Sequence, residues 1–375
     1  MVSIAFLILD DIHHVHHLAP IAFELSRRKE YQCVIYIQPH SIRVLKQIAA
    51  FYPGHGCEIR MLAPALVTRI KYKLRGKFCR SARVIRDHLD VLLNYDALIS
   101  ADFDMEELLS RSVNSAKKPL FCCILHGAGD RDFKQFPAMK DLDFVLLSGT
   151  KYQQRFLAAG FLKPENYAII GYPKFDVISA GNRRRLFTND KPTVIYNTHF
   201  LLDISSWQRW GIEILDYFYR QEFYNFIFAP HRNLFSRILK PRCLPKKYFN
   251  APHIHIDLGS EKSVDMTYTQ AADIYLGDVS SQVYEFIRQP KPCLFLNAHG
   301  VAWRDDPNYL CWQLGSVMES LPDLWIELAA RPMPNRYVDN QNKIFNDTFS
   351  MTSEPAAVRG ANAIHGRLTQ PRNYE

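Results

Sequence analysis

The chain has 375 residues, of which 47% are hydrophobic, 13% aromatic and 22% charged, and its formal net charge is +8. This composition excludes a largely disordered chain, and the length predicts two domains. No apolar run reaches the roughly 18 residues of a membrane span, and the N-terminus lacks the basic region and cleavage site of a signal peptide, so we expect a cytoplasmic protein.

Strand-like and helical stretches alternate through the first half of the chain. Runs rich in Val, Ile, Leu and Phe with the length of buried strands lie at residues 3–9, 31–37, 57–62, 96–102, 120–127, 143–149 and 167–173. Helical stretches lie between them, at residues 16–28, 41–51 and 152–161. This alternation is typical of a parallel sheet with helices on both faces.

The same pattern restarts after residue 190. Strand-like runs follow at residues 192–197, 225–230, 253–258, 273–278 and 292–297, with an amphipathic helix at 206–221. The two series predict an α/β protein with two doubly wound, Rossmann-like domains whose mostly parallel sheets face each other across a cleft. We expect an N-terminal, acceptor-side domain over residues 1–180, a C-terminal, nucleotide-donor-binding domain over 190–345, and a polar tail over 346–375.

A basic segment interrupts the first series. Between Arg69 and Arg86 there are eight basic residues and no acidic one. Such a run is either a solvated face or a contact for an anionic surface such as lipid headgroups. No zinc-finger spacing or RNP-like aromatic motif accompanies the charge, so nucleic acid is not an expected partner.

Four histidines, His13, His14, His16 and His17, directly follow the first predicted strand. Although His13 and His17 have the i, i+4 spacing of a helical metal pair, no Glu follows His13 as in H-E-x-x-H, and the sequence shows no further pair of ligands nearby. We therefore predict no bound metal here. The remaining interpretations are a pocket lining that faces the acceptor and local capping at a helix start.

Other polar motifs also follow predicted strands, where ligands of doubly wound sheets bind. They are LHGAGD, with His126, Gly127 and Asp130; GYPKFD, with Lys174 and Asp176; PHR, with His231 and Arg232; and GDVSSQVYE, with Asp278, Ser280, Ser281 and Glu285.

The serine pair predicts a helix start that can bind an anion. Ser280 and Ser281 are good residues for a helix start, where free N–H groups and the helix dipole favour an anion. Glu285 lies one turn further along, on the same face as Ser281, where a carboxylate can accept hydrogen bonds from a diol such as ribose. An ordinary capped helix with an exposed glutamate is the alternative.

Taken in order, HG, GYPK-x-D, Pro-His and D-x-S-S resemble the motifs of the CDP-glycerol glycerophosphotransferase family. The resemblance extends from His126 to Asn297. This family includes teichoic-acid primases and polymerases and has the GT-B fold. The resemblance implies transfer of glycerol phosphate, or a related polyol phosphate, from a CDP-activated donor to an acceptor hydroxyl of a cell-surface glycan or lipid, with release of CMP. It implies no obligatory cofactor, with Mg²⁺ as an optional aid at the diphosphate.

Site roles follow from the same resemblance. His126 matches the family's general base, and His231 matches the histidine on the donor diphosphate. The other implied donor-binding residues are Ser280, Ser281, Asp278, Glu285, Arg232, Gly127 and Lys174. The resemblance does not cover the four N-terminal histidines, but their position after the first predicted strand would place them, with Asp130, in a pocket on the acceptor side. Arg232 stands where the family usually has Pro, and Glu285 where it usually has Asp.

Two other functions fit the same sequence. One is a GT-B glycosyltransferase that uses a nucleotide sugar, and the other is a non-catalytic or metal-dependent sugar-binding protein on the same fold. For the enzyme, we expect peripheral contact with the inner face of the cell membrane through the Arg69–Arg86 segment.

Overall fold

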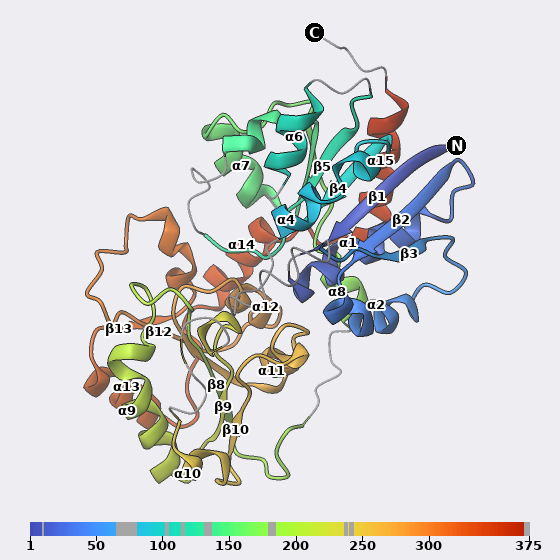
Figure 1. Cartoon of the computed structure of the whole chain (residues 1–375). Coiled ribbons are helices and arrows are strands. Elements are labelled where there is room, and N and C mark those ends of the chain that lie inside the picture. Colours follow the sequence, from blue (N-terminus) through green and yellow to red (C-terminus); the bar gives the residue numbers. More distant parts are fainter. Residues whose placement is uncertain are drawn as a thin grey trace. The chain divides into compact units, whose positions relative to one another are not determined.

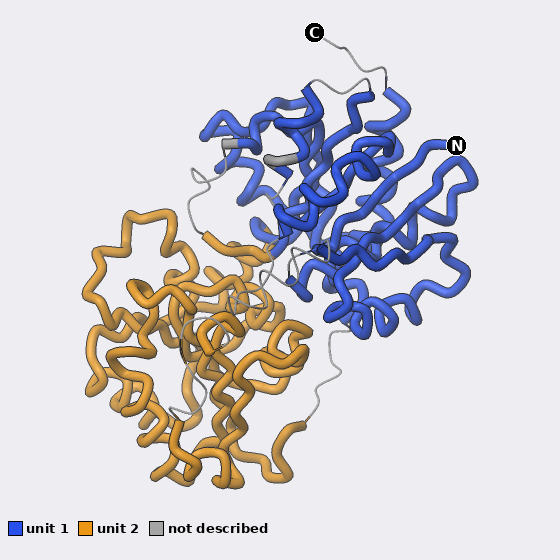
Figure 2. Tube along the Cα trace, viewed as in Figure 1, with its two compact units in different colours: residues 1–126, 133–179, 347–375 blue, residues 127–132, 180–346 orange. Residues whose placement is uncertain are grey.

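The computed structural model describes residues 1–9, 11–64, 81–101, 105–113, 117–130, 137–178, 185–235, 239 and 244–370. The chain divides into two compact units (Figure 2). Unit 1 comprises residues 1–126, 133–179 and 347–375, and unit 2 comprises residues 127–132 and 180–346.

Unit 1 is built on a seven-stranded sheet in the order β3-β2-β1-β4-β5-β6-β7 (Figure 1). Every pairing in it is parallel. The strands are β1 (Val2–Ile8), β2 (Tyr31–Ile37), β3 (Glu58–Met61), β4 (Ala97–Ser100), β5 (Leu120–Ile124), β6 (Phe144–Leu147) and β7 (Tyr167–Ile169). The central strands β4, β5 and β6 are buried along their whole length, as expected for runs of β-branched and large apolar residues in a covered parallel sheet.

The helices of unit 1 alternate with these strands. They are η1 (Ile12–His14), α1 (Val15–Leu25), η2 (Pro39–Ser41), α2 (Ile42–Ala49), α4 (Ser81–Arg86), α5 (Leu89–Leu92), α6 (Glu106–Ser112), η4 (Pro137–Asp141), α7 (Thr150–Ala158), α8 (Lys174–Val177) and α15 (Ala356–Thr369). Helix α1 is buried on nearly all sides because α2, α8 and α15 pack against it.

Unit 2 has a six-stranded sheet in the order β10-β9-β8-β11-β12-β13. All its pairings are parallel. The strands are β8 (Thr193–Asn197), β9 (Asn225–Phe228), β10 (Ile254–Ile256), β11 (Ile274–Gly277), β12 (Cys293–Leu296) and β13 (Ser316–Met318). The core beside it is aromatic: Phe218 stacks on Phe226 at 4.0 Å and Trp207 on Phe228 at 4.8 Å between ring centroids.

The helices of unit 2 are α9 (Trp207–Arg220), α10 (Lys246–Phe249), η7 (Glu261–Ser263), α11 (Thr267–Ala271), α12 (Gln282–Phe286), η8 (Pro307–Leu314), α13 (Leu321–Ala329) and α14 (Val338–Thr348). The chain passes back into unit 1 within α14.

The predicted fold class is confirmed, because each unit is a parallel sheet with the strand order of a Rossmann-like domain. Residues 346–375, expected as a polar tail, contain α15, which packs on α1 and belongs to unit 1. Most of the predicted membrane-contact segment, residues 69–80, lies outside the described residues, and its end forms α4. Each helix in the described ranges is too short or too polar to cross a membrane.

Candidate active site

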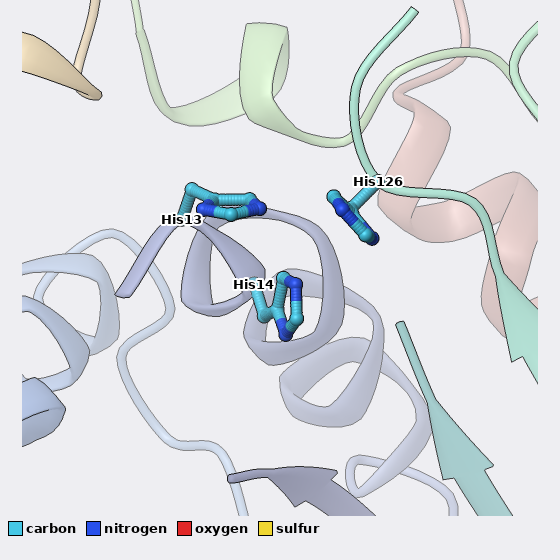
Figure 3. Close-up of side chains that lie close together, drawn as sticks. All are labelled: His13, His14 and His126. Carbon is cyan, nitrogen blue, oxygen red and sulfur yellow. The ribbon is translucent and has the colours of Figure 1, made fainter. Parts of the chain in front are cut away.

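In unit 1, three neighbouring strands bring the candidate residues together at the carboxyl edge of the sheet. The strands β1, β4 and β5 are adjacent, and they are followed respectively by His13 and His14, by Ala101 and by His126. The rings of His13, His14 and His126, here called the histidine trio, point toward one another (Figure 3). Their centroids are 4.5 Å apart for His13–His14, 4.8 Å for His13–His126 and 4.4 Å for His14–His126.

The protonation of His126 is set by the chain segment that follows β4. Its Nδ1 lies 2.7 Å from the carbonyl oxygen of Ala101. A carbonyl only accepts hydrogen bonds, so Nδ1 must carry the proton, and in the neutral ring the lone pair is on Nε2. His126 is partly buried. This is the tautomer and orientation that a general base requires.

Asp11 organises the start of the short helix η1. Its carboxylate accepts a hydrogen bond from the backbone N–H of Ile12 at 2.7 Å and lies 3.4 Å from His13 Nδ1. His14, next along the helix, is only 2% exposed. Burial, with smaller contributions from His126 and His13, holds the pKa of His14 well below its usual value, so this ring is neutral at pH 7.

His16 and His17 turn into unit 1 instead of joining the trio. Both are buried on α1, and the His17 ring packs edge-on against Tyr172 with centroids 4.7 Å apart. Burial, followed by the charge of Lys174, lowers the pKa of His16 to about 3 and that of His17 well below its usual range. Lys174, predicted to bind the donor, is itself buried beside these rings in unit 1. The four N-terminal histidines therefore divide into two pairs with different surroundings.

In unit 2, the candidate residues follow β9, β8 and β11, which are also neighbours in their sheet. His231 follows β9, and the backbone N–H of Asn233 donates to His231 Nδ1 at 3.2 Å. In the neutral ring, Nδ1 therefore carries the lone pair and Nε2 the proton. This tautomer is the opposite of that in His126. An Nε2–H donor suits contact with a phosphate oxygen.

His199, which the motif comparison missed, lies beside His231. It follows β8, its ring centroid is 5.8 Å from that of His231, and its Nδ1 accepts from the N–H of Leu201 at 3.0 Å. It therefore presents Nε2–H in the same way. The signal that could have found it is its position: His199 comes two residues after a predicted strand, as the other candidates do.

Ser280 and Ser281 follow β11 and precede α12, as predicted, but this helix has only five residues. Its dipole is correspondingly small, so any anion here would depend on individual hydroxyl and N–H groups. The glycine loop after His126 belongs to the same unit and packs on Ser281. Gly127 has φ +74°, and a Cβ there would lie 3.4 Å from Ser281 Oγ. Only glycine readily allows both this backbone and this approach.

Asp130 attaches the glycine loop to unit 2. Both of its carboxylate oxygens lie 2.7 Å from the hydroxyl of Tyr284 on α12, and one accepts from the N–H of Cys311 at 2.9 Å. Asp130 is 1% exposed. The residue predicted for the acceptor pocket is thus held inside unit 2, four positions after His126 in the chain.

Asp278, two residues before the serine pair, is fully buried. Its carboxylate accepts from the backbone N–H of His199 at 2.9 Å and of Ser206 at 3.0 Å. Burial raises its pKa to about 7 against the effect of these hydrogen bonds. Without exposed surface, Asp278 can act on a ligand only by shaping the loop that carries His199.

The other predicted donor residues lie nearby in unit 2. Glu285 is on α12 and is buried. Arg232 follows His231 and packs against the loop after β10, where a Cβ on Gly259 would lie 2.9 Å from Arg232 Cβ.

The GYPKFD motif contacts the C-terminal segment. The Asp176 carboxylate accepts from the N–H groups of Ala356 at 3.1 Å and Ala357 at 2.7 Å, which caps α15. Gly171 has φ +85°, and a Cβ there would collide with Arg359 and the carbonyl of Ser350. These two residues of the motif therefore have a structural part in unit 1.

Comparison with known proteins shows the fold alone. No model of a protein family matches the chain, and no curated protein does. Solved structures do match. One is a variant of the wall teichoic acid polymerase TagF soaked with CDPG, at 14% identity and TM-score 0.63, over 98% of this chain and 88% of that one.

Two other structures match at similar levels. The S. aureus MnaA–UDP complex matches at 13% identity and TM-score 0.63, over 100% of both chains. The glycotransferase of kitacinnamycin matches at 11% identity and TM-score 0.53, over 97% of this chain and 98% of that one. The chain is thus similar in fold to these three proteins.

Proposed function

We propose that the chain is a glycerophosphotransferase that moves glycerol phosphate, or a related polyol phosphate, from a CDP-activated donor to an acceptor hydroxyl and releases CMP. The observation that carries this proposal is the pair of opposite tautomers, with a lone pair on Nε2 of His126 and a proton on Nε2 of His231. A transfer between two oxygens requires one group that takes a proton and one that stabilises the departing phosphate.

In the proposed reaction, His126 Nε2 takes the proton of the acceptor hydroxyl. The acceptor oxygen forms a bond to the phosphorus that bears the glycerol, and the bond from that phosphorus to the bridging oxygen of the diphosphate breaks. CMP leaves with the bonding electrons, and the Nε2–H groups of His231 and His199 donate to its phosphate. Ser280, Ser281 and Arg232 would supply further donors to the diphosphate. Such a transfer depends mainly on positioning and charge stabilisation.

Three features support the donor side of this proposal. The sequence motifs resemble the CDP-glycerol family, the fold matches TagF soaked with CDPG, and the donor-side groups converge at the carboxyl edge of one sheet. The glycine loop also belongs to the donor side. It begins directly after His126, yet it packs on Ser281 and is attached through Asp130 to α12.

The test is a screen of purified protein against CDP-glycerol, CDP-ribitol and UDP-sugars, with nucleotide products measured by mass spectrometry. We expect CMP from a CDP-polyol. His126→Ala should reduce its rate of release by about 10² to 10⁴, and His231→Ala by about 10² to 10³. The control is His40→Ala, which removes an exposed histidine of unit 1. Equal rates in the control and in both site variants would refute the assigned roles.

A nucleotide-sugar glycosyltransferase is the second candidate, because the glycotransferase of kitacinnamycin and the MnaA–UDP complex match nearly the whole chain in fold. Turnover of UDP-sugars without release of CMP from any CDP-polyol would favour it. Binding of a donor without turnover, unchanged in His126→Ala, would favour a non-catalytic sugar-binding protein.

The proposed enzyme acts at the inner face of the membrane, where the Arg69–Arg86 segment contacts anionic lipid. This part of the proposal rests on the sequence charge. Binding to anionic vesicles should weaken as salt rises from 0.05 to about 0.5 M, because salt screens exposed charges. Binding that is independent of salt, or that survives neutralisation of these residues, would count against it.

A further inference from the structure

The histidine trio has an arrangement that the transferase proposal does not need. One ring nitrogen from each of His13, His14 and His126 lies within 4.8 Å of the others. Two of the rings come from η1 and the third from the segment after β5, and they lie close together (Figure 3). We propose that the trio binds one divalent transition-metal ion of the zinc class.

The donor set fits such an ion. Three imidazoles suit Zn²⁺, Ni²⁺ and Cu²⁺, whereas Mg²⁺ and Ca²⁺ prefer oxygen ligands. Tetrahedral zinc with bonds of about 2.0 to 2.1 Å to nitrogen needs ligand atoms roughly 3.4 Å apart. The nitrogens now lie within 4.8 Å of one another, and we expect binding of the ion to draw them to that shorter spacing by rotation of the side chains. The fourth position would stay open to water or to a substrate oxygen.

The groups behind the trio support the same assignment. His126 donates its Nδ1–H to the carbonyl of Ala101 at 2.7 Å, which directs Nε2 toward the metal position. The carboxylate of Asp11 lies 3.4 Å from His13 Nδ1. Histidine ligands of metals usually have such a carbonyl or carboxylate partner on the other nitrogen, and it fixes the ring and raises its basicity. His126 has such a hydrogen-bonded partner, and the Asp11 carboxylate lies close enough to His13 to become one.

The inference is independent of the proposed transferase activity, since it rests only on the geometry of unit 1. It also has a consequence for that activity. A single lone pair on His126 Nε2 cannot hold both a metal ion and a proton, so the ion and the free base exclude each other in one molecule.

The experiment measures metal binding directly, without a donor or acceptor present. Full-length protein is freed of metal with a chelator and titrated with ZnCl₂ by calorimetry, and with CoCl₂ by visible absorption. We expect one equivalent of tight binding and the ligand-field bands of four-coordinate Co²⁺. His13→Ala should weaken binding by at least about 100-fold, because loss of a ligand should exceed the 10- to 100-fold cost of changing an outer partner.

Two further variants sharpen the test. Asp11→Asn keeps a side chain that can cap η1 but removes the carboxylate, so binding should weaken by about 10- to 100-fold. His40→Ala, the exposed control, should bind like the unaltered protein. Circular dichroism checks that each variant is folded.

Two outcomes would overturn the inference. One is the absence of any stoichiometric Zn²⁺ or Co²⁺ binding, which would leave the trio as a set of packed pocket residues. The other is tight binding that is equal in His13→Ala, His126→Ala and His40→Ala, which would place the ion elsewhere. Neither outcome affects the transferase proposal, whose test measures release of CMP.

Discussion

His126 and His231 have the same side chain but present opposite groups on Nε2, and in each case one backbone group decides which. The carbonyl of Ala101 holds the proton on Nδ1 of His126, while the N–H of Asn233 occupies Nδ1 of His231. The motifs identify both residues in the sequence, but the tautomers follow only from the folded chain. The partner of His126 is 25 positions away, on a different strand end.

The raised pKa of the buried Asp278 carboxyl predicts one contribution to the pH dependence of stability. Its folded pKa of about 7 lies above the ordinary value of 3.8 for an aspartate. Between these values Asp278 holds more of its proton in the folded state than in the unfolded state, so its contribution to the free energy of unfolding should fall as pH rises from 4 to 7. Over this window of about three pH units, the contribution of Asp278 to the free energy of unfolding should change by about 4 kcal/mol. Asp278→Asn keeps an acceptor oxygen and removes the charge.

The measurement is urea unfolding of both proteins at pH 5, 6, 7 and 8. Relative to Asp278→Asn, the unaltered protein should lose stability across this range. Parallel curves for the two proteins would show that Asp278 does not change its ionisation on unfolding.

The lowered pKa of His16 predicts a contribution to stability with the opposite pH dependence. Its folded pKa of about 3 lies below the ordinary value of 6.5 for a histidine, so below pH 6.5 the unfolded state binds this proton more readily and the contribution of His16 to stability falls as pH falls. The cost at pH 5 is about 2 kcal/mol. The stability of the unaltered protein relative to His16→Leu, measured by thermal unfolding, should therefore decrease from pH 7 to pH 5. His40→Ala should behave like the unaltered protein.

Helix α15 shows how an element can depend on a motif distant in sequence. Its first N–H groups are capped by Asp176, which lies 180 positions earlier. Its inner face fits closely against α1, because a Cβ on Gly360 would lie 2.6 Å from Ile21 Cδ1. The GYPKFD motif therefore helps to hold the C-terminal helix in unit 1.

Replacement of Asp176 tests this structural part. Asp176→Ala should lower the free energy of unfolding by about 1 kcal/mol, while Asp176→Asn, which can still cap, should lower it much less. Chemical unfolding of the two variants measures the difference. If Ala and Asn cost the same, the capping bonds do not stabilise α15.

Elements with a long apolar pattern could be predicted closely, and short ones could not. The predicted strand at 31–37 matches β2, and the predicted helix at 206–221 contains α9. Helix α12 has only five residues, shorter than a helix start at Ser280 and Ser281 suggests. Pro290 and Pro292 follow it before β12, and proline cannot continue a helix.

Contacts between distant segments limited how much of the candidate site could be predicted from the sequence. His126, His231 and the serine pair could be selected because each follows a predicted strand. Parallel strands place their carboxyl ends at one edge of the sheet, where ligands bind. The same rule could not show that Asp130 bonds Tyr284 or that Lys174 lies beside His16, since these depend on packing. His199 also follows a predicted strand, but it belongs to none of the motifs.

At the scale of the whole molecule, the C-terminal segment completes unit 1. Phe349 packs against Tyr172 and Phe175, and Ile364 is 1% exposed. Exposing Phe349 and Ile364 alone would cost about 3 to 6 kcal/mol, at about 1.5 to 3 for each side chain.

A chain that ends at Asn346 should therefore be destabilised in unit 1 by at least this amount. Thermal unfolding and protease sensitivity of unit 1 measure the effect. A chain that ends at Gln370 keeps α15 and serves as the control. Equal stability of the two shortened chains would show that α15 adds nothing to unit 1.

The return of the chain to its first unit also has a meaning for synthesis. A ribosome makes the strands of unit 1 before those of unit 2, but the helix α15 that covers α1 emerges only after both. Until then, the apolar surface of α1 that α15 covers is exposed, while unit 2 already has all its strands. Unit 1 is therefore begun before unit 2 and completed after it, and nascent chains stalled near residue 346 should be the ones that chaperones retain.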